Sequence, residues 1–458
     1  MHSADWQARA SNCLTASAAR WHDPKYGIVF THGRSATLWD VDGRDYIDLT
    51  CGYSVSNFGH AFPPISDVVA RQAGQLSHLT GELHPQKIQL AEQLLQHLWN
   101  IAARPPGVEN APTPSALHAG RADAGKVVFN STGARAVETA WKAAVAFRPG
   151  KLVALELGFH GRSIATSPLS QLGQSTPTDP QLAPEAYCVW PTTESLYCEQ
   201  CPLGKVHPAC QLACTSDLFE EIEQQASTVS AILVEPAWGA RGYIFPPQEF
   251  FLRLRQITRR HGIVLIADEI QTGLGRCGDW LLSHAQGWQA DLTLVGKSLG
   301  GGVVPISAVV GSAAILESIP QNTESETFAA SPFACNVALE TLRQLASGHW
   351  FKQAQKLGAE LREMVGQIVK TTGIPCRIDG QGAVCTIEFA SQERPIELAQ
   401  RRTLDVMKRC VALGLLVHYT GPRKTRIVLL PPFTILPEEL EATRRRLQQV
   451  FTQSASSA

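Results

Sequence analysis

The residues with the clearest chemical potential are a lysine and an aspartate that each follow a predicted buried strand. Lys297 comes just after the apolar run Leu292–Val295 and is followed by three glycines, Gly300 to Gly302. Burial disfavours the ammonium form of a lysine, so it favours the neutral amine that attacks carbonyl carbons. The glycines let the backbone turn sharply and lie close to whatever this amine contacts. A surface lysine on a glycine turn is the competing interpretation of this stretch taken alone.

Asp268 stands 29 residues before Lys297 and ends the apolar run 263–267. A continuous apolar run of this kind predicts a parallel strand that is buried on both faces. Acidic residues at the carboxyl end of such a strand face the crevice in which α/β sheets bind ligands. Pyridoxal phosphate suits this pair, because the lysine can bind its aldehyde carbon covalently and the aspartate can pair with its protonated ring nitrogen.

In these and several further motifs the chain resembles the class-III aminotransferases, the ornithine and 4-aminobutyrate transaminase group of fold-type-I pyridoxal-phosphate enzymes. The matching motifs run in order from about Leu38 to Pro437. The resemblance implies an α/β fold: a large domain with a mostly parallel seven-stranded sheet, and a small α+β domain from both chain ends. We expect residues 1–60 to join the small domain, residues 61–333 to form the large cofactor-binding domain, and residues 334–458 to form the C-terminal small domain.

A phosphate site is predicted where the strand 126–129 runs into a Ser-Thr-Gly-Ala segment and a long helix. The first turn of a helix has free N–H groups and the positive end of the helix dipole, which together attract phosphate. The resemblance places the cofactor phosphate on the backbone of Gly133 and Ala134. An ordinary Ser/Thr helix cap is the alternative. Arg135 departs from the family, which often carries an acid at this position.

The resemblance assigns further residues to the rest of the cofactor. Phe159 takes the position of an aromatic residue that stacks on the pyridine ring, although a core phenylalanine is the alternative. Ile270 is expected on the opposite ring face, Gln271 at the ring hydroxyl, and Glu235 as a second acid near the cofactor. Thr327 matches a threonine that reaches the phosphate of the neighbouring subunit, which implies a homodimer or a dimer of dimers.

The expected activity is transfer of an amino group between an amine or amino acid and a 2-oxo acid. Lys297 is then the general base and acid that moves the proton. Racemases, aminomutases and lyases share these motifs and remain open as alternatives. A non-catalytic binding or regulatory protein on the same scaffold is disfavoured, because Lys297 and Asp268 are both present.

On the substrate side, the sequence departs from the family at two positions. The family's carboxylate-binding arginine falls at Val428, and the glutamate that shields this arginine falls at Ala240. Arg241 and Arg426 are therefore candidate replacement contacts for a substrate carboxylate. Tyr53 lies in a glycine-rich segment that, in the family, helps to line the substrate mouth, with simple packing as the alternative.

A cluster of cysteines with the spacing C-x2-C-x8-C-x3-C raises the question of a metal. Four thiolates can hold tetrahedral zinc, but the second pair has the wrong gap for a zinc ribbon. We therefore expect no metal, and interpret the segment as a packed surface loop like the cysteine-containing insertion of some class-III sequences. The cysteines are Cys198, Cys201, Cys210 and Cys214.

Composition narrows the class of protein further. The 458 residues suffice for more than one domain, and 40 Lys and Arg against 41 Asp and Glu give a net charge of −1. This balance gives no reason to expect nucleic acid or an anionic membrane as a partner. No apolar run reaches the roughly 18 residues of a membrane span. The N-terminal stretch lacks an apolar signal core, so we expect a cytoplasmic protein whose cysteines are thiols.

Overall fold

The computed structural model of the chain describes residues 2–15, 27–99, 124–170, 186–190, 208–389, 396–421 and 423–455. The chain divides into two compact units. The larger unit is Asp67–Lys352, and the smaller unit combines Met1–Ser66 with Gln353–Ala458. Both ends of the chain thus contribute to the smaller unit. Residues 334–352, which we expected in the C-terminal domain, fall in the larger unit, where the helix Pro332–Ala346 packs on the helix Pro85–Leu94.

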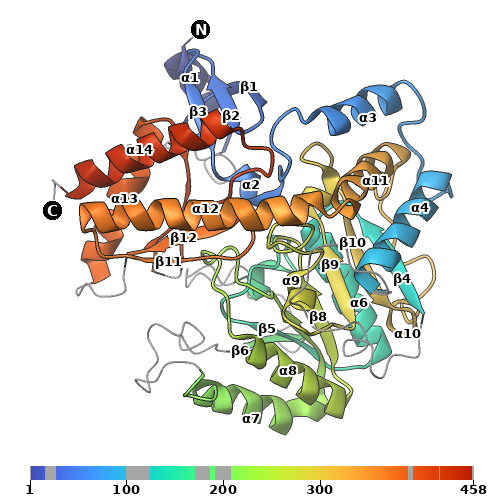
Figure 1. Cartoon of the computed structure of the whole chain (residues 1–458). Helices are drawn as coiled ribbons and strands as arrows, with labels where there is room; N and C mark the ends of the chain where they lie inside the picture. The colour runs from blue at the N-terminus through green and yellow to red at the C-terminus, as the bar shows by residue number, and fades with distance from the viewer. Residues whose placement is uncertain are drawn as a thin grey trace. The chain divides into compact units, whose positions relative to one another are not determined.

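The larger unit is built on a sheet that has seven strands among the described residues, in the order β4-β10-β9-β8-β7-β5-β6 (Figure 1). Strands β9, β8, β7, β5 and β6 run parallel, whereas β10 is antiparallel to both β9 and β4. The predicted seven-stranded, mostly parallel sheet is therefore confirmed. The strands are β4 (Gly125–Asn130), β5 (Lys151–Leu155), β6 (Tyr187–Trp190), β7 (Val229–Val234), β8 (Val264–Asp268), β9 (Leu292–Val295) and β10 (Ser307–Ser312).

The helical segments of the larger unit follow ordinary capping rules at several ends. Ser331 accepts a hydrogen bond from the Ala334 N–H at 3.2 Å, and Gly262 takes a left-handed conformation (φ 64°) after the helix that ends at His261. The segments are α3 (Pro63–Ala73), α4 (Pro85–Leu94), η1 (Leu95–Trp99), α6 (Gly133–Phe147), η2 (Ser167–Leu169), η5 (Ala213–Thr215), α7 (Ser216–Gln225), η6 (Ala226–Thr228), α8 (Gln248–His261), α9 (Leu282–Ala285), η7 (Lys297–Gly300), α10 (Ala313–Leu316) and α11 (Pro332–Ala346).

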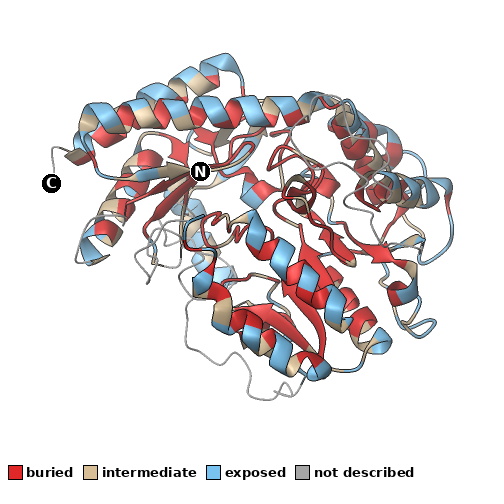
Figure 2. Ribbon diagram, turned by 60° about the horizontal axis from the view of Figure 1, so that its bottom comes forward, coloured by how far each residue is buried: buried red, intermediate tan, exposed pale blue. Residues whose placement is uncertain are grey.

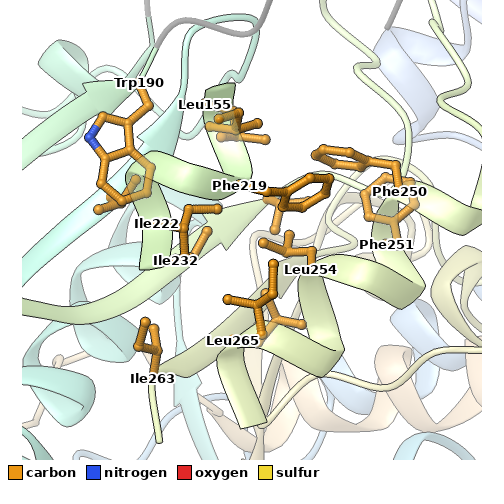
Figure 3. Packing of buried hydrophobic residues seen from close by; sticks show 14 of the residues in the cluster. Leu155, Trp190, Phe219, Ile222, Ile232, Phe250, Phe251, Leu254, Ile263 and Leu265 are labelled. Atoms are coloured by element: carbon orange, nitrogen blue, oxygen red, sulfur yellow. The ribbon is translucent and has the colours of Figure 1, made fainter. Parts of the chain in front are cut away.

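Helices cover both faces of this sheet. Successive side chains of each strand point to opposite faces, so β5, β7 and β8 contribute to both buried clusters. On one face, Leu233 and Ile266 belong to a buried cluster with α6. On the other face, Ile232 and Leu265 belong to a second cluster with α7 and α8, which is drawn in Figure 3. The inner strands β5 and β7 to β10 are accordingly almost continuously buried (Figure 2), whereas the edge strands β4 and β6 are partly buried. This double cover explains why the strands read as unbroken apolar runs, and it leaves the strand ends as the places for polar residues.

Among its described residues, the smaller unit contains two four-stranded sheets, β1-β2-β3-β13 and β11-β12-β15-β14. Strands β2 and β3 form an antiparallel hairpin, and Gly43 turns between them with a φ of 82°. The elements are α1 (Ser3–Cys13), β1 (Phe30–Arg34), β2 (Thr37–Asp40), β3 (Asp45–Asp48), α2 (Cys51–Ser54), α12 (His349–Thr372), β11 (Arg377–Asp379), β12 (Cys385–Glu388), α13 (Ile396–Ala412), β13 (Leu415–Leu416), β14 (His418–Thr420), β15 (Arg426–Leu429) and α14 (Pro437–Ala455). Across the described residues of the whole chain, no helix combines the length and the apolar character that crossing a membrane requires.

Candidate active site

Four neighbouring parallel strands of the larger unit each lead into one polar part of the candidate site. Strand β5 precedes Phe159 and His160, β7 precedes Glu235, β8 ends in Asp268, and β9 precedes Lys297. The carboxyl ends of parallel strands meet at one edge of a sheet, where α/β folds bind ligands. The sheet topology therefore gathers residues that lie far apart in the sequence.

Lys297 has a strained backbone and a shifted pKa. Its φ is 44°, a left-handed conformation that costs a residue with a side chain about 1–2 kcal/mol. Burial lowers the pKa of its amine to about 8, although the negative charges of Asp268 and Glu235 act in the opposite direction. An appreciable fraction of the amine is therefore neutral near pH 8, which is the reactive form.

Asp268 is buried and held by two hydrogen bonds, one on each carboxylate oxygen. His160 Nδ1 lies 2.8 Å from Oδ2, and the Ile270 N–H donates to Oδ1 at 3.2 Å. The histidine is buried as well. These bonds fix the plane of the carboxylate. The sequence motif assigned a role to Phe159 and none to His160, although the place of the histidine in the same Gly-Phe-His-Gly segment was the available signal.

Glu235 is the second buried acid of the site. It accepts hydrogen bonds from the Phe159 N–H at 2.7 Å and from the Gly239 N–H at 3.2 Å. Burial raises the pKa of Glu235 to about 7, and the charge of Asp268 adds to this rise. Through these two bonds, Glu235 ties the segment that follows β5 to the turn that follows its own strand.

The amino end of α6 has the geometry of an anion cradle. Thr132 caps the helix by accepting from the Arg135 N–H at 3.3 Å, while the N–H groups of the first turn, at Gly133 and Ala134, have no carbonyl partner within the helix. A Cβ at Gly133 would lie only 2.9 Å from Ile270 Cδ1, so a side chain there would displace the isoleucine. The cradle therefore lies against Ile270, two residues beyond Asp268, which fits a phosphorylated cofactor spanning from α6 to Asp268.

A charged network surrounds this cradle. Arg135 pairs with Glu138 at 3.2 Å, with Glu324 at 2.9 Å and with Glu326 at 3.6 Å. Glu326 also accepts from the Ser131 N–H at 3.1 Å, which brings its carboxylate next to the start of α6. Burial works against the charge of Glu324, yet hydrogen bonds from Lys142 and Thr139 and the nearby Arg135 hold its pKa below its usual value. Arg135 thus offsets the negative charge of three carboxylates that lie beside the proposed phosphate site.

We expect Arg135→Gln to weaken cofactor binding by about tenfold, because the carboxylates near the cradle lose a partly exposed cation. Equilibrium binding of pyridoxal phosphate to the cofactor-free protein measures this effect, and added salt should reduce it. Arg343→Gln is the matched control, since Arg343 is an exposed arginine that pairs with Glu340 on α11. Equal affinities of the Arg135→Gln protein and the parent at low salt would contradict the prediction.

The candidate substrate residues lie in both units. Arg241 belongs to the turn after β7 and is 6% exposed. In the smaller unit, Tyr53 is 44% exposed and stacks on His418, with 4.0 Å between ring centroids. Tyr53 sits in α2, a left-handed turn that no pattern in the sequence indicates. Arg426 is 2% exposed and its Nε lies 2.5 Å from Glu388, so its guanidinium already has a carboxylate partner.

The remaining candidates concern the subunit contact and the cysteines. Thr327 is exposed on the segment before α11. Cys198 and Cys201 lie outside the described residues, while Cys210 is buried and Cys214 is partly buried. The described residues contain no group of three or more His, Cys, Asp or Glu side chains arranged to hold a metal ion. The absence of metal from the cysteine segment remains a prediction.

Comparisons with known proteins identify the family. Residues 17–451 match the family model "Aminotransferase class-III". A leucine/methionine racemase of Thermococcus litoralis is 29% identical over 93% of this chain and 90% of its own length. A 5-aminovalerate aminotransferase of Pseudomonas aeruginosa is 30% identical over 93% of this chain and 94% of its own. A solved Bacillus anthracis aminotransferase has a TM-score of 0.82 and 20% identity, with 98% of each chain covered. The chain therefore belongs to the class-III aminotransferases and is a pyridoxal-phosphate-dependent enzyme of fold type I.

Proposed function

We propose that this enzyme moves an amino group between an amine or amino acid and a 2-oxo acid, as a cytoplasmic homodimer or dimer of dimers. The observation that carries the proposal is the arrangement of Lys297 beside the buried Asp268–His160 pair. Lys297 has a lowered pKa, and the carboxylate is fixed at 2.8 Å from the histidine. A reactive amine and a fixed carboxylate within electrostatic reach of each other are the two groups that this chemistry needs.

The proposed cofactor contacts are those that the family resemblance implies, and the close packing of Gly133 against Ile270 supports them. Gly133 and Ala134 hold the phosphate through their free N–H groups. Phe159 and Ile270 contact the two faces of the ring, and Gln271 donates to the ring hydroxyl oxygen. Glu235 acts indirectly, through its 2.7 Å bond to the Phe159 N–H. When bound, pyridoxal phosphate supplies the carbonyl carbon that accepts the amino group and a ring that withdraws electrons.

The proposed catalytic roles belong to Lys297 and Asp268. Lys297 anchors the cofactor and, once released by an incoming amine, removes the proton from the substrate carbon and returns it as general acid. Asp268 pairs with the ring nitrogen and keeps it protonated. His160 holds the Asp268 carboxylate in the plane that this pairing requires, so it is a positioning residue.

An oligomer is supported by apolar side chains that the single chain leaves exposed. Leu83, Val303 and Phe328 are 77%, 54% and 67% exposed. The segments that carry Leu83 and Phe328 are neighbours, because His84 Nε2 lies 2.9 Å from the Ala330 carbonyl oxygen. We propose that this surface contacts a second copy and that Thr327 reaches the cofactor phosphate of that copy. Sedimentation of the cofactor-loaded protein tests this: a stable and fully active monomer would refute it.

The activity is tested with a panel of amine donors, each assayed with pyruvate, with 2-oxoglutarate and without a 2-oxo acid. A transaminase forms the new amino acid only when the 2-oxo acid is present. The alternatives on the same scaffold, a racemase, an aminomutase or a lyase, convert the donor without it. Conversion of an amino acid in the absence of any 2-oxo acid would therefore replace the proposed reaction with one of these. A protein that binds the cofactor but converts no donor under any condition would support a non-catalytic role.

A further inference from the structure

The turn after β7 carries an arginine in an unusual environment. Trp238 and Ile244 form an isolated antiparallel bridge, and the Gly242 N–H donates to the Gly239 carbonyl oxygen at 3.0 Å. These bonds close a tight turn whose tip contains Arg241. The residue is 6% exposed, although turns usually lie on the surface where their polar groups meet water.

The guanidinium of Arg241 has no partner among the described residues. Its Nε is closed off from solvent and donates no hydrogen bond, and no described carboxylate forms an ion pair with it. The charges of Glu156 and Glu235 lie close enough to favour the cation, but burial outweighs them and lowers the pKa of Arg241. A buried cation without a hydrogen-bonded partner is costly, so this environment calls for an anion from outside the chain.

Two other buried arginines of the same chain have a carboxylate partner, although the Nε of Arg255, like that of Arg241, donates no hydrogen bond. Arg255 binds Asp291 through two hydrogen bonds of 2.5 and 2.7 Å, and Arg426 binds Glu388 at 2.5 Å. Such pairs compensate the desolvation of both charges. Arg241 differs from both, because the two acids near it are beyond ion-pair distance.

The turn is joined to the candidate site by direct contacts. The Gly239 N–H donates to Glu235, the acid that also holds Phe159. A Cβ at Gly239 would lie only 2.6 Å from Gln271 Oε1, so the turn packs closely on the residue proposed to contact the ring hydroxyl. Arg241 follows two residues later. The arginine is therefore held at the side of the site where Phe159 and Gln271 lie.

We propose that Arg241 binds the carboxylate of the substrate, and that the enzyme selects amino acids and 2-oxo acids over amines without a carboxylate. The inference rests on the proposed function, because it assumes that a substrate binds beside the cofactor. The cofactor phosphate has its own cradle at α6, so Arg241 is available for the other anionic group, the substrate carboxylate. Its guanidinium has the planar fork of donors that binds a carboxylate through two hydrogen bonds.

The test uses the cofactor-loaded enzyme and matched pairs of amines. L-leucine is compared with 3-methylbutylamine, and 4-aminobutyrate with propylamine, so that each pair differs by one carboxylate. We expect Arg241→Met to lower kcat/KM by about 10²-fold or more for the carboxylate member alone, as for a lost charged hydrogen bond. Arg241→Lys keeps the positive charge but not the planar fork of donors, so its kcat/KM for the carboxylate member should lie between the values of Arg241→Met and the parent. Arg253→Met, which removes an exposed arginine of α8, is the control.

A binding measurement separates this inference from the proposed function. Glutarate carries two carboxylates but neither an amine nor a keto group, so it cannot react with the cofactor, and its stabilisation of the enzyme in a thermal shift needs no turnover. We expect glutarate to stabilise the parent and Arg253→Met but not Arg241→Met, whichever reaction the enzyme catalyses. If Arg241→Met does not fold, the Arg241→Lys protein decides through the same two measurements. The proposal is overturned if the folded variants bind glutarate like the parent, or if both members of each amine pair lose activity equally.

Discussion

Lys297→Ala should retain bound pyridoxal phosphate and lose turnover by about 10⁴-fold or more. The phosphate cradle at Gly133 and Ala134 and the Asp268–His160 pair remain in this variant, so most non-covalent contacts with the cofactor persist. The loss of rate follows from the removal of the group that we assign to both anchoring and proton transfer, and proton transfer alone is worth up to about 10⁴-fold. Single-turnover kinetics with saturating amine measures the effect.

Two further measurements bear on the same lysine. Borohydride treatment of the parent, followed by peptide mapping, should place the cofactor on Lys297, and a label on another lysine would refute the assignment. Because burial lowers the pKa of this amine to about 8, its neutral form increases as the pH rises through that value. The rate at which cofactor-free protein captures pyridoxal phosphate should therefore rise up to about pH 8 and then level off, until the other groups titrate.

Asp268→Asn should lower kcat by about 10³-fold, with a smaller effect on cofactor binding. The amide has nearly the same shape but no charge, so it cannot hold a proton on the ring nitrogen, and His160 loses its anionic partner at 2.8 Å. Removal of one charge-stabilising group from an enclosed site typically costs about 10²–10³-fold. The readout is the rate of the half-reaction with amine alone, measured by the change in cofactor absorbance.

The control for this variant is Asp291→Asn, which removes a carboxylate next to β9 that is paired with Arg255. We expect it to lower the free energy of unfolding, since a mostly buried arginine loses its partner, but to leave the rate per folded molecule unchanged. His160→Gln should show a milder loss of rate than Asp268→Asn, because it disturbs the orientation of the carboxylate and not its charge. Parent-like turnover in Asp268→Asn would contradict the assigned role.

The sequence predicted best those features that depend on a local pattern. The apolar runs before Asp268 and Lys297 are strands in the structure because both faces of the sheet are covered, and such strands need no alternation of polar residues. The helix after Thr132 was predictable for the same reason, since its cap and its apolar positions are close in the sequence. Local patterns of this kind are sufficient to assign the polar strand ends to one edge of a sheet.

Features that depend on contacts between distant residues were not predictable from the pattern alone. The bond between His160 and Asp268 joins residues 108 positions apart, and nothing in either segment indicates the other. The pairing of Arg426 with Glu388 is fixed by the register of β15 on β12, which a single sequence does not reveal. The left-handed φ angles at Tyr53 and Lys297 are likewise imposed by the surrounding structure, because neither residue type favours them.

The network around Arg135 has a consequence for evolution and for protein engineering. Arg135 supplies a cation at the start of α6, and Glu324 and Glu326 are the acids that face it. An acid at position 135 alone would crowd like charges beside the phosphate cradle, whereas an acid there together with cations at positions 324 and 326 would keep the balance. The effect of each substitution therefore depends on the other, which is epistasis. A substitution or a chimera that changes only one of these two segments is therefore expected to weaken cofactor binding.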